Sequence, residues 1–189
     1  VNEAIADLAT ASYANPNSAE THNLLGLAYE QKGLRNRALN SFARAVELSQ
    51  NNPEYLNNFG YVLFKNGDYE NAAKFLQRAA RLDSNNPRIW NNLGLAQCEL
   101  GRFNEAYKSF AAAQGEFKGH LNIAARLQNV GKANEAIKHL EKALILQPNS
   151  VEALEPLVNL YESTGKQNQA QNVRKSLLTL RGLAPTVGQ

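Results

Sequence analysis

The sequence predicts an all-α fold, an α-solenoid of stacked antiparallel helix pairs. Two observations lead to this prediction. The tetrapeptide NNFG at 57–60 recurs 34 residues later as NNLG at 91–94, and the tripeptide GDY at 67–69 recurs at the same distance as GRF at 101–103. A fixed period of this length is the signature of stacked repeats, in which each unit buries its apolar face against its neighbours.

The register of this repeat extends through most of the chain. A glycine expected at the turn between two helices recurs at Gly33, Gly67, Gly101, Gly131 and Gly165. A residue expected inside the first helix of each unit recurs at Gly26, Gly60, Gly94, Ala124 and Val158. These positions are spaced by 34, 34, 30 and 34 residues, so one unit has lost four residues.

The pattern resembles the tetratricopeptide repeat (TPR) family. The residues of one unit that match the family pattern are Trp90, Leu93, Gly94, Ala106, Phe110 and Ala113, and those of another are Tyr29, Ala38, Phe42 and Ala45. Pro148 holds the proline position of a third unit. The resemblance implies a right-handed α-solenoid, the TPR superhelix. A weaker likeness links the chain to bacterial TPR proteins that assemble pili or secretion machines.

The repeat register divides the chain into one incomplete and five complete units. We expect the second helix of an incomplete leading repeat at residues 1–18, followed by repeats at 19–52, 53–86, 87–116, 117–150 and 151–181 and a tail at 182–189. Because the chain begins in mid-repeat, we expect it to be a fragment of a longer protein. Leu177, Leu178, Leu180 and Leu183 should either fold over the last repeat or meet a second subunit.

Local signals mark the helix ends in these repeats. Pro53 and Pro87 stand where a first helical turn tolerates a missing N–H group, and Asn52 and Asn86 precede them as expected caps. In the short third repeat, we expect the second helix to end one turn early. Gly115 and Gly119 lie close together after that helix, and we expect both to supply the tight connection that follows.

Small residues are expected to form the seam between the two helices of each repeat. A glycine inside a helix costs about 1 kcal/mol relative to alanine, so close packing must offset this cost. Facing alanines would let the two backbones approach. The expected structural residues are Gly26, Ala38, Gly60, Ala72, Gly94, Ala106, Ala136 and Ala170.

Composition excludes several classes of function. The net charge is +3 with mixed signs, which does not indicate nucleic-acid binding. No apolar run is long enough to insert into a membrane. The single cysteine, Cys98, excludes an internal disulfide. No Walker loop, HExxH, CxxC or GxSxG motif occurs, so we expect no enzyme activity, cofactor or metal. His22, His120 and His139 are spread along the chain, and a packing role is expected for the first two.

The first helices carry the candidate site, because the resemblance implies that they line a concave groove. The expected groove residues are Asn23, Asn57, Asn58, Tyr61, Phe64, Lys65, Arg88, Asn91, Asn92, Leu95, Cys98 and Asn122. Asparagine is a mediocre helix former, so its recurrence needs a reason. Its amide offers a donor and an acceptor, as does an extended peptide backbone. The competing interpretation is that these amides bond to neighbouring helices or to solvent.

The sequence therefore predicts a protein–protein interaction scaffold that binds an extended peptide or partner segment in this groove. The TPR clamp for acidic C-terminal peptides is not expected, because Asn23 and Leu27 replace its lysine and asparagine. Two alternatives stay open. In the first alternative, the array is the substrate-recruiting arm of a larger enzyme. In the second, its end repeats form a homo-oligomer. The compartment of such a soluble chain, cytoplasmic or periplasmic, is not determined by the sequence.

Overall fold

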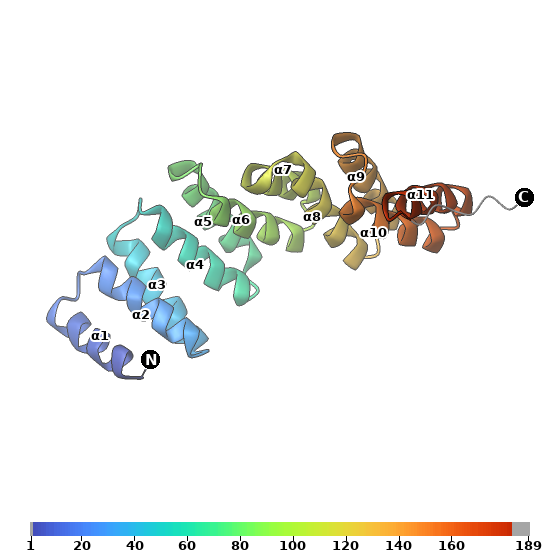
Figure 1. Ribbon diagram of the computed structural model, residues 1–189. Helices are drawn as coiled ribbons and strands as arrows, with labels where there is room; N and C mark the ends of the chain where they lie inside the picture. The colour runs from blue at the N-terminus through green and yellow to red at the C-terminus, as the bar shows by residue number, and fades with distance from the viewer. Residues whose placement is uncertain (1, 183–189) are drawn as a thin grey trace, which may run out of the picture. The chain divides into compact units, whose positions relative to one another are not determined.

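The computed structural model describes residues 2–182, which form eleven α-helices and no strand (Figure 1). The helices are α1 (Asn2–Ala14), α2 (Ala19–Gln31), α3 (Arg35–Leu48), α4 (Pro53–Lys65), α5 (Tyr69–Leu82), α6 (Pro87–Glu99), α7 (Phe103–Gln114), α8 (Glu116–Asn129), α9 (Ala133–Leu146), α10 (Val151–Ser163) and α11 (Gln167–Leu180). Val1 and Leu183 lie outside the described residues, as does the expected tail except for Gly182.

The chain divides into two compact units, Val1–Arg102 and Phe103–Gln189. In the first unit, α1 packs on α2, α2 on α3, and each later helix on the next, through to α6. In the second unit, α7 packs on α8, α8 on α9, α9 on α10, and α10 on α11. The boundary between the units falls inside the span expected for the third repeat, between α6 and α7.

Capping side chains fix where the helices of the first unit begin. Asn52 Oδ1 accepts hydrogen bonds from the backbone N–H groups of Glu54 and Tyr55 at 2.9 and 3.3 Å, and Pro53 is the first residue of α4. Asn86 Oδ1 caps α6 by accepting a hydrogen bond from the backbone N–H of Arg88 at 3.2 Å. These bonds satisfy N–H groups that have no partner inside the helix. At the turn that follows α4, Gly67 has a φ of 83°, a conformation that glycine adopts without strain.

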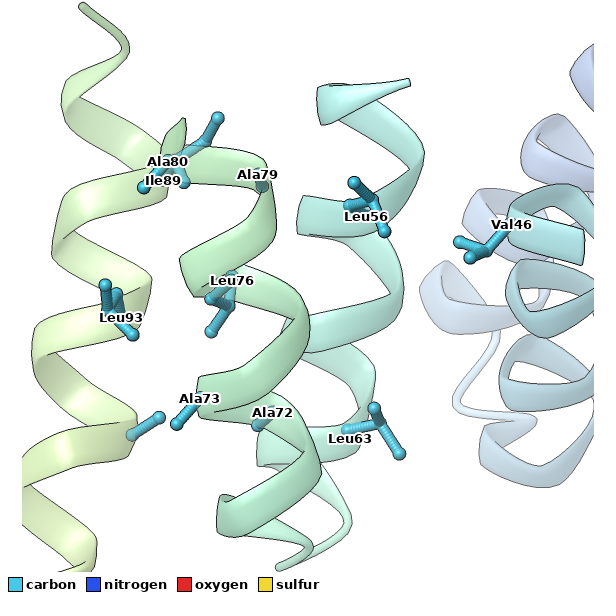
Figure 2. Close-up of a cluster of buried hydrophobic side chains, with 11 residues drawn as sticks. Val46, Leu56, Leu63, Ala72, Ala73, Leu76, Ala79, Ala80, Ile89 and Leu93 are labelled. Carbon is cyan, nitrogen blue, oxygen red and sulfur yellow. The ribbon is translucent and has the colours of Figure 1, made fainter. Parts of the chain in front are cut away.

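The core of the first unit fills the space between its successive helices. Figure 2 shows Leu76 and Ala73 on α5, Leu56 and Leu63 on α4, and Leu93 on α6 within one cluster of buried side chains. Leu56 and Leu76 are completely buried. Burying a leucine of this kind stabilises the fold by about 1.5–3 kcal/mol. This apolar contact positions α4 and α6, which carry most of the expected groove residues.

Two glycines of the first unit lie where a side chain would collide with a neighbouring helix. A Cβ atom added to Gly26 would lie 2.5 Å from ring carbons of Phe42, and one added to Gly60 would lie 2.7 Å from Leu76 Cγ. The close neighbours are thus the large residues Phe42 and Leu76, and the recurring Ala38 and Ala72 are fully buried beside them.

The connection between α7 and α8 differs from the expectation. Gly115 alone separates the two helices and has a φ of 87°. Gly119 was expected in this connection, and that prediction is wrong, because Gly119 lies inside α8 and is buried. A Cβ atom at Gly119 would lie 3.0 Å from Ala111 Cα on α7. The role of Gly119 is therefore to let α7 and α8 pack closely, and the turn between them is made by Gly115.

The last helices of the second unit share a small apolar core. Leu177 of α11 packs with Leu154 and Val158 of α10. Leu180 remains 41% exposed. Homo-oligomerisation through this end of the chain stays a prediction. Among residues 2–182, no helix is both long and apolar enough to cross a membrane.

Candidate functional site

Four asparagines of the first unit form a continuous chain of hydrogen bonds across three helices. Asn92 Nδ2 on α6 donates to Asn57 Oδ1 on α4 at 2.9 Å. Asn57 Nδ2 donates to Asn58 Oδ1 at 3.4 Å, and Asn58 Nδ2 donates to Asn23 Oδ1 on α2 at 3.0 Å. Every donor points in the same direction, from α6 through α4 to α2. We call these four residues the amide chain.

The amide chain is largely buried. Asn23, Asn57 and Asn58 are 3%, 3% and 4% exposed, and Asn92 is half-buried. A buried amide without a partner costs about 1–3 kcal/mol, so each of these groups stabilises the packing only while its neighbour is in place. The structure thus brings four of the expected groove residues together and bonds them to one another. Their binding of a peptide stays a prediction.

Arg88 reaches the amide chain, and two acidic side chains lie near Tyr55 on the same helices. An Nη atom of Arg88 on α6 lies 3.5 Å from Asn58 Oδ1, at the limit of a hydrogen bond. Burial, followed by the negative charges of Glu20 and Glu54, raises the pKa of Tyr55. Glu20 at the start of α2 and Glu54 at the start of α4 therefore both lie close enough to Tyr55 to raise its pKa.

The C-terminal half of α4 carries an aromatic patch. Tyr61 and Phe64 stack with ring centroids 6.5 Å apart, and Phe64 lies 5.6 Å from the ring of Tyr69 at the start of α5. Lys65 Nζ lies 5.9 Å from the Tyr61 ring centroid. Three of these residues were expected in the groove. Tyr61 and Phe64 are half-buried, so part of each ring is exposed.

The remaining expected residues of the first unit lie on α6. Asn91 and Leu95 are half-buried, and Cys98 is 7% exposed. The thiol of Cys98 therefore lies largely within the packed interior.

The second unit contains a hollow of about 280 Å³ on the face of α8 and α10, which we call the α8/α10 hollow. Its lining residues are Leu121, Asn122, Ala124, Ala125, Gln128, Leu140, Glu152 and Pro156. Asn122 was expected in the groove. Ala124 and Leu140 are buried, whereas Ala125 and Gln128 are exposed. The hollow thus has an apolar floor, contributed partly by α9, and amide groups on its sides.

An ion pair lies at the edge of the α8/α10 hollow. Lys118 Nζ is 2.5 Å from Glu152 Oε2, which joins the N-terminal part of α8 to that of α10. Both side chains are about half exposed. Such an exposed pair contributes little to stability, but it leaves one charge of each sign beside the apolar floor.

Sequence reasoning missed a pair of histidines in the second unit. His120 Nδ1 on α8 lies 2.9 Å from His139 Nδ1 on α9, and the His120 ring stacks on Tyr107 of α7 at 4.4 Å. The two histidines were treated as unrelated because they fall in different helices at an unremarkable spacing of 19 residues. Pairing a first helix with the second helix of the same repeat would have placed them together. Among the described residues, no three His, Cys, Asp or Glu side chains could jointly hold a metal ion.

Comparison with known families identifies the repeats of the first unit. Tetratricopeptide repeat models match residues 19–52 and 41–74, and a TPR repeat model matches residues 60–101. Residues 19–101 therefore carry tetratricopeptide repeats, which confirms the resemblance predicted from the sequence. A comparison with curated proteins found no match.

Solved structures share the fold of the chain at low sequence identity. A MamA crystal structure is 19% identical, with a TM-score of 0.65 over 87% of this chain and 92% of that one. YrrB, described as a TPR protein with an unusual peptide-binding site, is 16% identical, with a TM-score of 0.63 over 93% of this chain and 92% of that one. PilF of Pseudomonas aeruginosa is 22% identical, with a TM-score of 0.55 over 90% and 77%. These likenesses confirm an α-solenoid of helix pairs.

Proposed function

We propose that this protein is a non-catalytic scaffold that binds an extended segment of a partner protein through first helices of its repeats. In the second unit, the α8/α10 hollow would hold an apolar side chain of that segment. In the first unit, the aromatic patch of α4 would be a contact surface in its own right. The observation that carries this proposal is the α8/α10 hollow, because it is a concavity on the expected face.

The chemistry of the α8/α10 hollow suits a peptide better than a small polar metabolite. Its floor of Ala124 and Leu140 is apolar, and Asn122 and Gln128 each offer an amide with one acceptor and two donor hydrogens. An extended backbone presents alternating C=O and N–H groups that such amides can bind. Ligand sites of this kind combine an apolar surface with a few polar groups that fix the orientation of the ligand.

The amide chain of the first unit has a different part in this proposal. Because Asn57 and Asn58 are bonded to neighbouring helices, we infer that they hold α2, α4 and α6 together and leave direct contact to Tyr61, Phe64 and Lys65. YrrB supports the general idea that a protein of this fold binds peptides, since a peptide-binding site is described for it.

A substitution that fills the α8/α10 hollow tests the proposal. Peptides would first be selected from a random display library on the wild-type protein, and their affinities would be measured by calorimetry. Ala125→Trp adds a large side chain at an exposed position that lines the hollow. Ala112→Trp, at an exposed position of α7 outside the hollow, is the matched control.

The expected result is that Ala125→Trp weakens binding of the selected peptides at least tenfold while Ala112→Trp leaves it within twofold. Circular dichroism would verify that both variants retain their helices. Equal affinity for all three proteins would refute the hollow as the binding site. Failure to select any peptide on the wild-type protein would count against the whole proposal.

A further inference from the structure

The histidine pair joins two helices through one hydrogen bond that both rings must share. His120 is 7% exposed, and His139 is half-buried. Their Nδ1 atoms are 2.9 Å apart, which is the length of a good hydrogen bond between nitrogens. For this bond to form, one Nδ1 must carry a hydrogen and the other must offer a lone pair. The pair therefore requires that at least one imidazole is neutral.

Protonation of both rings would break this contact. Two imidazolium rings would face each other with an N–H group on each Nδ1, and neither nitrogen would accept. The first proton can be taken up at the Nε2 of the donating ring, which keeps the bond but places a charge in a largely buried site. The second proton converts the attraction between the rings into repulsion and removes the hydrogen bond that joins α8 to α9.

Titratable groups from three helices surround the pair. Tyr107 of α7 covers the His120 ring at 4.4 Å and lies 5.8 Å from the His139 ring. Glu116 is the acidic group of α8 near His120. The charged groups of α9 around His139 are Glu135, Lys138, Glu141 and Lys142. Glu141 is engaged by the Tyr161 hydroxyl of α10 at 2.7 Å, so part of its capacity to compensate a proton is already used.

These surroundings disfavour the protonated rings. Burial, followed by the positive charge of His120 and that of Lys142, lowers the pKa of His139 from 6.5 to about 4. Burial is also the main cause that lowers the pKa of His120, with Lys142 next. When folding lowers the pKa of a histidine, its contribution to stability is fully present at pH values above the unfolded-state pKa of 6.5. This stabilisation is lost as the pH falls from 6.5 toward 4.

The pair adjoins the α8/α10 hollow directly in the chain. Leu121, Asn122 and Leu140 line the hollow. Leu121 and Asn122 directly follow His120 on α8, and Leu140 directly follows His139 on α9. A separation of α8 from α9 would therefore move the floor of the hollow relative to its sides. We propose that the His120–His139 pair is a pH-sensitive latch that keeps the α8/α10 hollow in its binding form while at least one ring is neutral.

The geometry favours a hydrogen bond over a metal site. Two histidine ligands of a tetrahedral zinc ion, each bonded at about 2.0–2.1 Å, hold their nitrogens roughly 3.3 Å apart. The pair is closer than this, and among the described residues no group of three metal-binding side chains is present.

Thermal unfolding between pH 8 and pH 4 tests the latch independently of any partner. His139→Asn replaces Nδ1 by an amide that can still bond to His120 but does not titrate. His22→Asn, which changes the third histidine, in the first unit, is the matched control. We expect the wild type and His22→Asn to lose melting temperature in parallel between pH 6.5 and pH 4, and His139→Asn to lose several degrees less. Equal losses in all three proteins would overturn the latch.

Nuclear magnetic resonance provides a measurement on the unaltered protein. The imidazole signals of His139 should titrate with a midpoint close to 4, and a midpoint near 6.5 would overturn the proposal even where His139→Asn does not fold. Zinc chloride would be added to the wild type and to His139→Asn at pH 7.5. If zinc raises the melting temperature of the wild type alone, the pair is a metal site and the latch is refuted. The latch predicts no difference.

The effect of the latch on binding rests on the proposed function and is measured separately. With a peptide selected on the wild-type protein, affinity should fall about twofold from pH 7 to pH 4 in the wild type, because about half of the His139 rings are then protonated, and should change clearly less in His139→Asn. Equal pH dependence in the two proteins would overturn the link between the latch and the α8/α10 hollow. If no peptide binds at any pH, the proposed function fails, whereas the unfolding and titration results still decide the latch.

Discussion

The amide chain makes a prediction that separates a structural role from a ligand-binding role. Asn58 donates to Asn23 and accepts from Asn57, and all three side chains are buried. Replacing Asn58 by alanine would leave Asn23 Oδ1 without its donor and Asn57 Nδ2 without its acceptor. If these amides instead awaited a peptide at the surface, the same substitution would cost little in the free protein.

The size of the effect follows from the number of buried groups left without a partner. Each orphaned buried polar group costs about 1–3 kcal/mol, so two of them predict that Asn58→Ala lowers the free energy of unfolding by about 3 kcal/mol. Asn92→Ala orphans one buried oxygen, that of Asn57, and should cost about half as much. For a chain of this length, 3 kcal/mol corresponds to a fall in melting temperature of roughly 6–12 °C.

Urea titration and thermal unfolding, both followed by circular dichroism at 222 nm, measure this ranking. Asn40→Ala, at an exposed position of α3, is the control and should change stability by less than about 0.5 kcal/mol. If Asn58→Ala behaved like Asn40→Ala, the amide chain would not hold the helices together, and its side chains would be available to a ligand.

Two further predictions concern packing. Gly26→Ala gains about 1 kcal/mol in helix propensity but should still destabilise the protein by about 1–2 kcal/mol, because the new Cβ would lie 2.5 Å from the buried Phe42 ring. Adding Phe42→Leu to this variant should recover part of the loss in urea titrations. If the stability losses of the two single variants simply add in the double variant, the collision is contradicted. Tyr161→Phe removes the hydrogen bond to Glu141 and should lower stability by about 1 kcal/mol. Burial and the hydrogen bond to Glu141 raise the pKa of the Tyr161 hydroxyl to about 12, so the ultraviolet absorbance change at that pH should be smaller in Tyr161→Phe. A Tyr161→Phe protein as stable as the wild type would show that the bond contributes nothing.

The helix pairs could be predicted because their signal is local and recurs. A turn glycine and a buried alanine at constant spacing identify where each helix ends and which face it buries, and Ala72 and Ala136 are indeed fully buried. The shortened third repeat was visible as a spacing of 30 residues. The placement of Gly119 was predicted incorrectly, because a deletion can be absorbed either in a loop or in a helix. The chain absorbed it by starting α8 directly after Gly115.

The direction of the asparagine side chains could not be predicted from their recurrence. A residue that repeats every 34 positions can face a groove or the next repeat, and period alone does not separate the two. The bonds Asn23–Asn58 and Asn57–Asn92 each span 35 residues, which joins one position of a repeat to the adjacent position of the next. The His120–His139 contact lies within one repeat, where the period carries no information.

The central claim is that the face of α8 and α10 binds an extended segment of a partner. Hydrogen exchange measured by mass spectrometry, with and without a selected peptide, tests this claim most directly. We predict slower exchange on binding in residues 121–128 and 152–156, with little change along the exposed faces of α7 and α9. Protection confined to α7 and α9, with residues 121–128 unaffected, would contradict the claim.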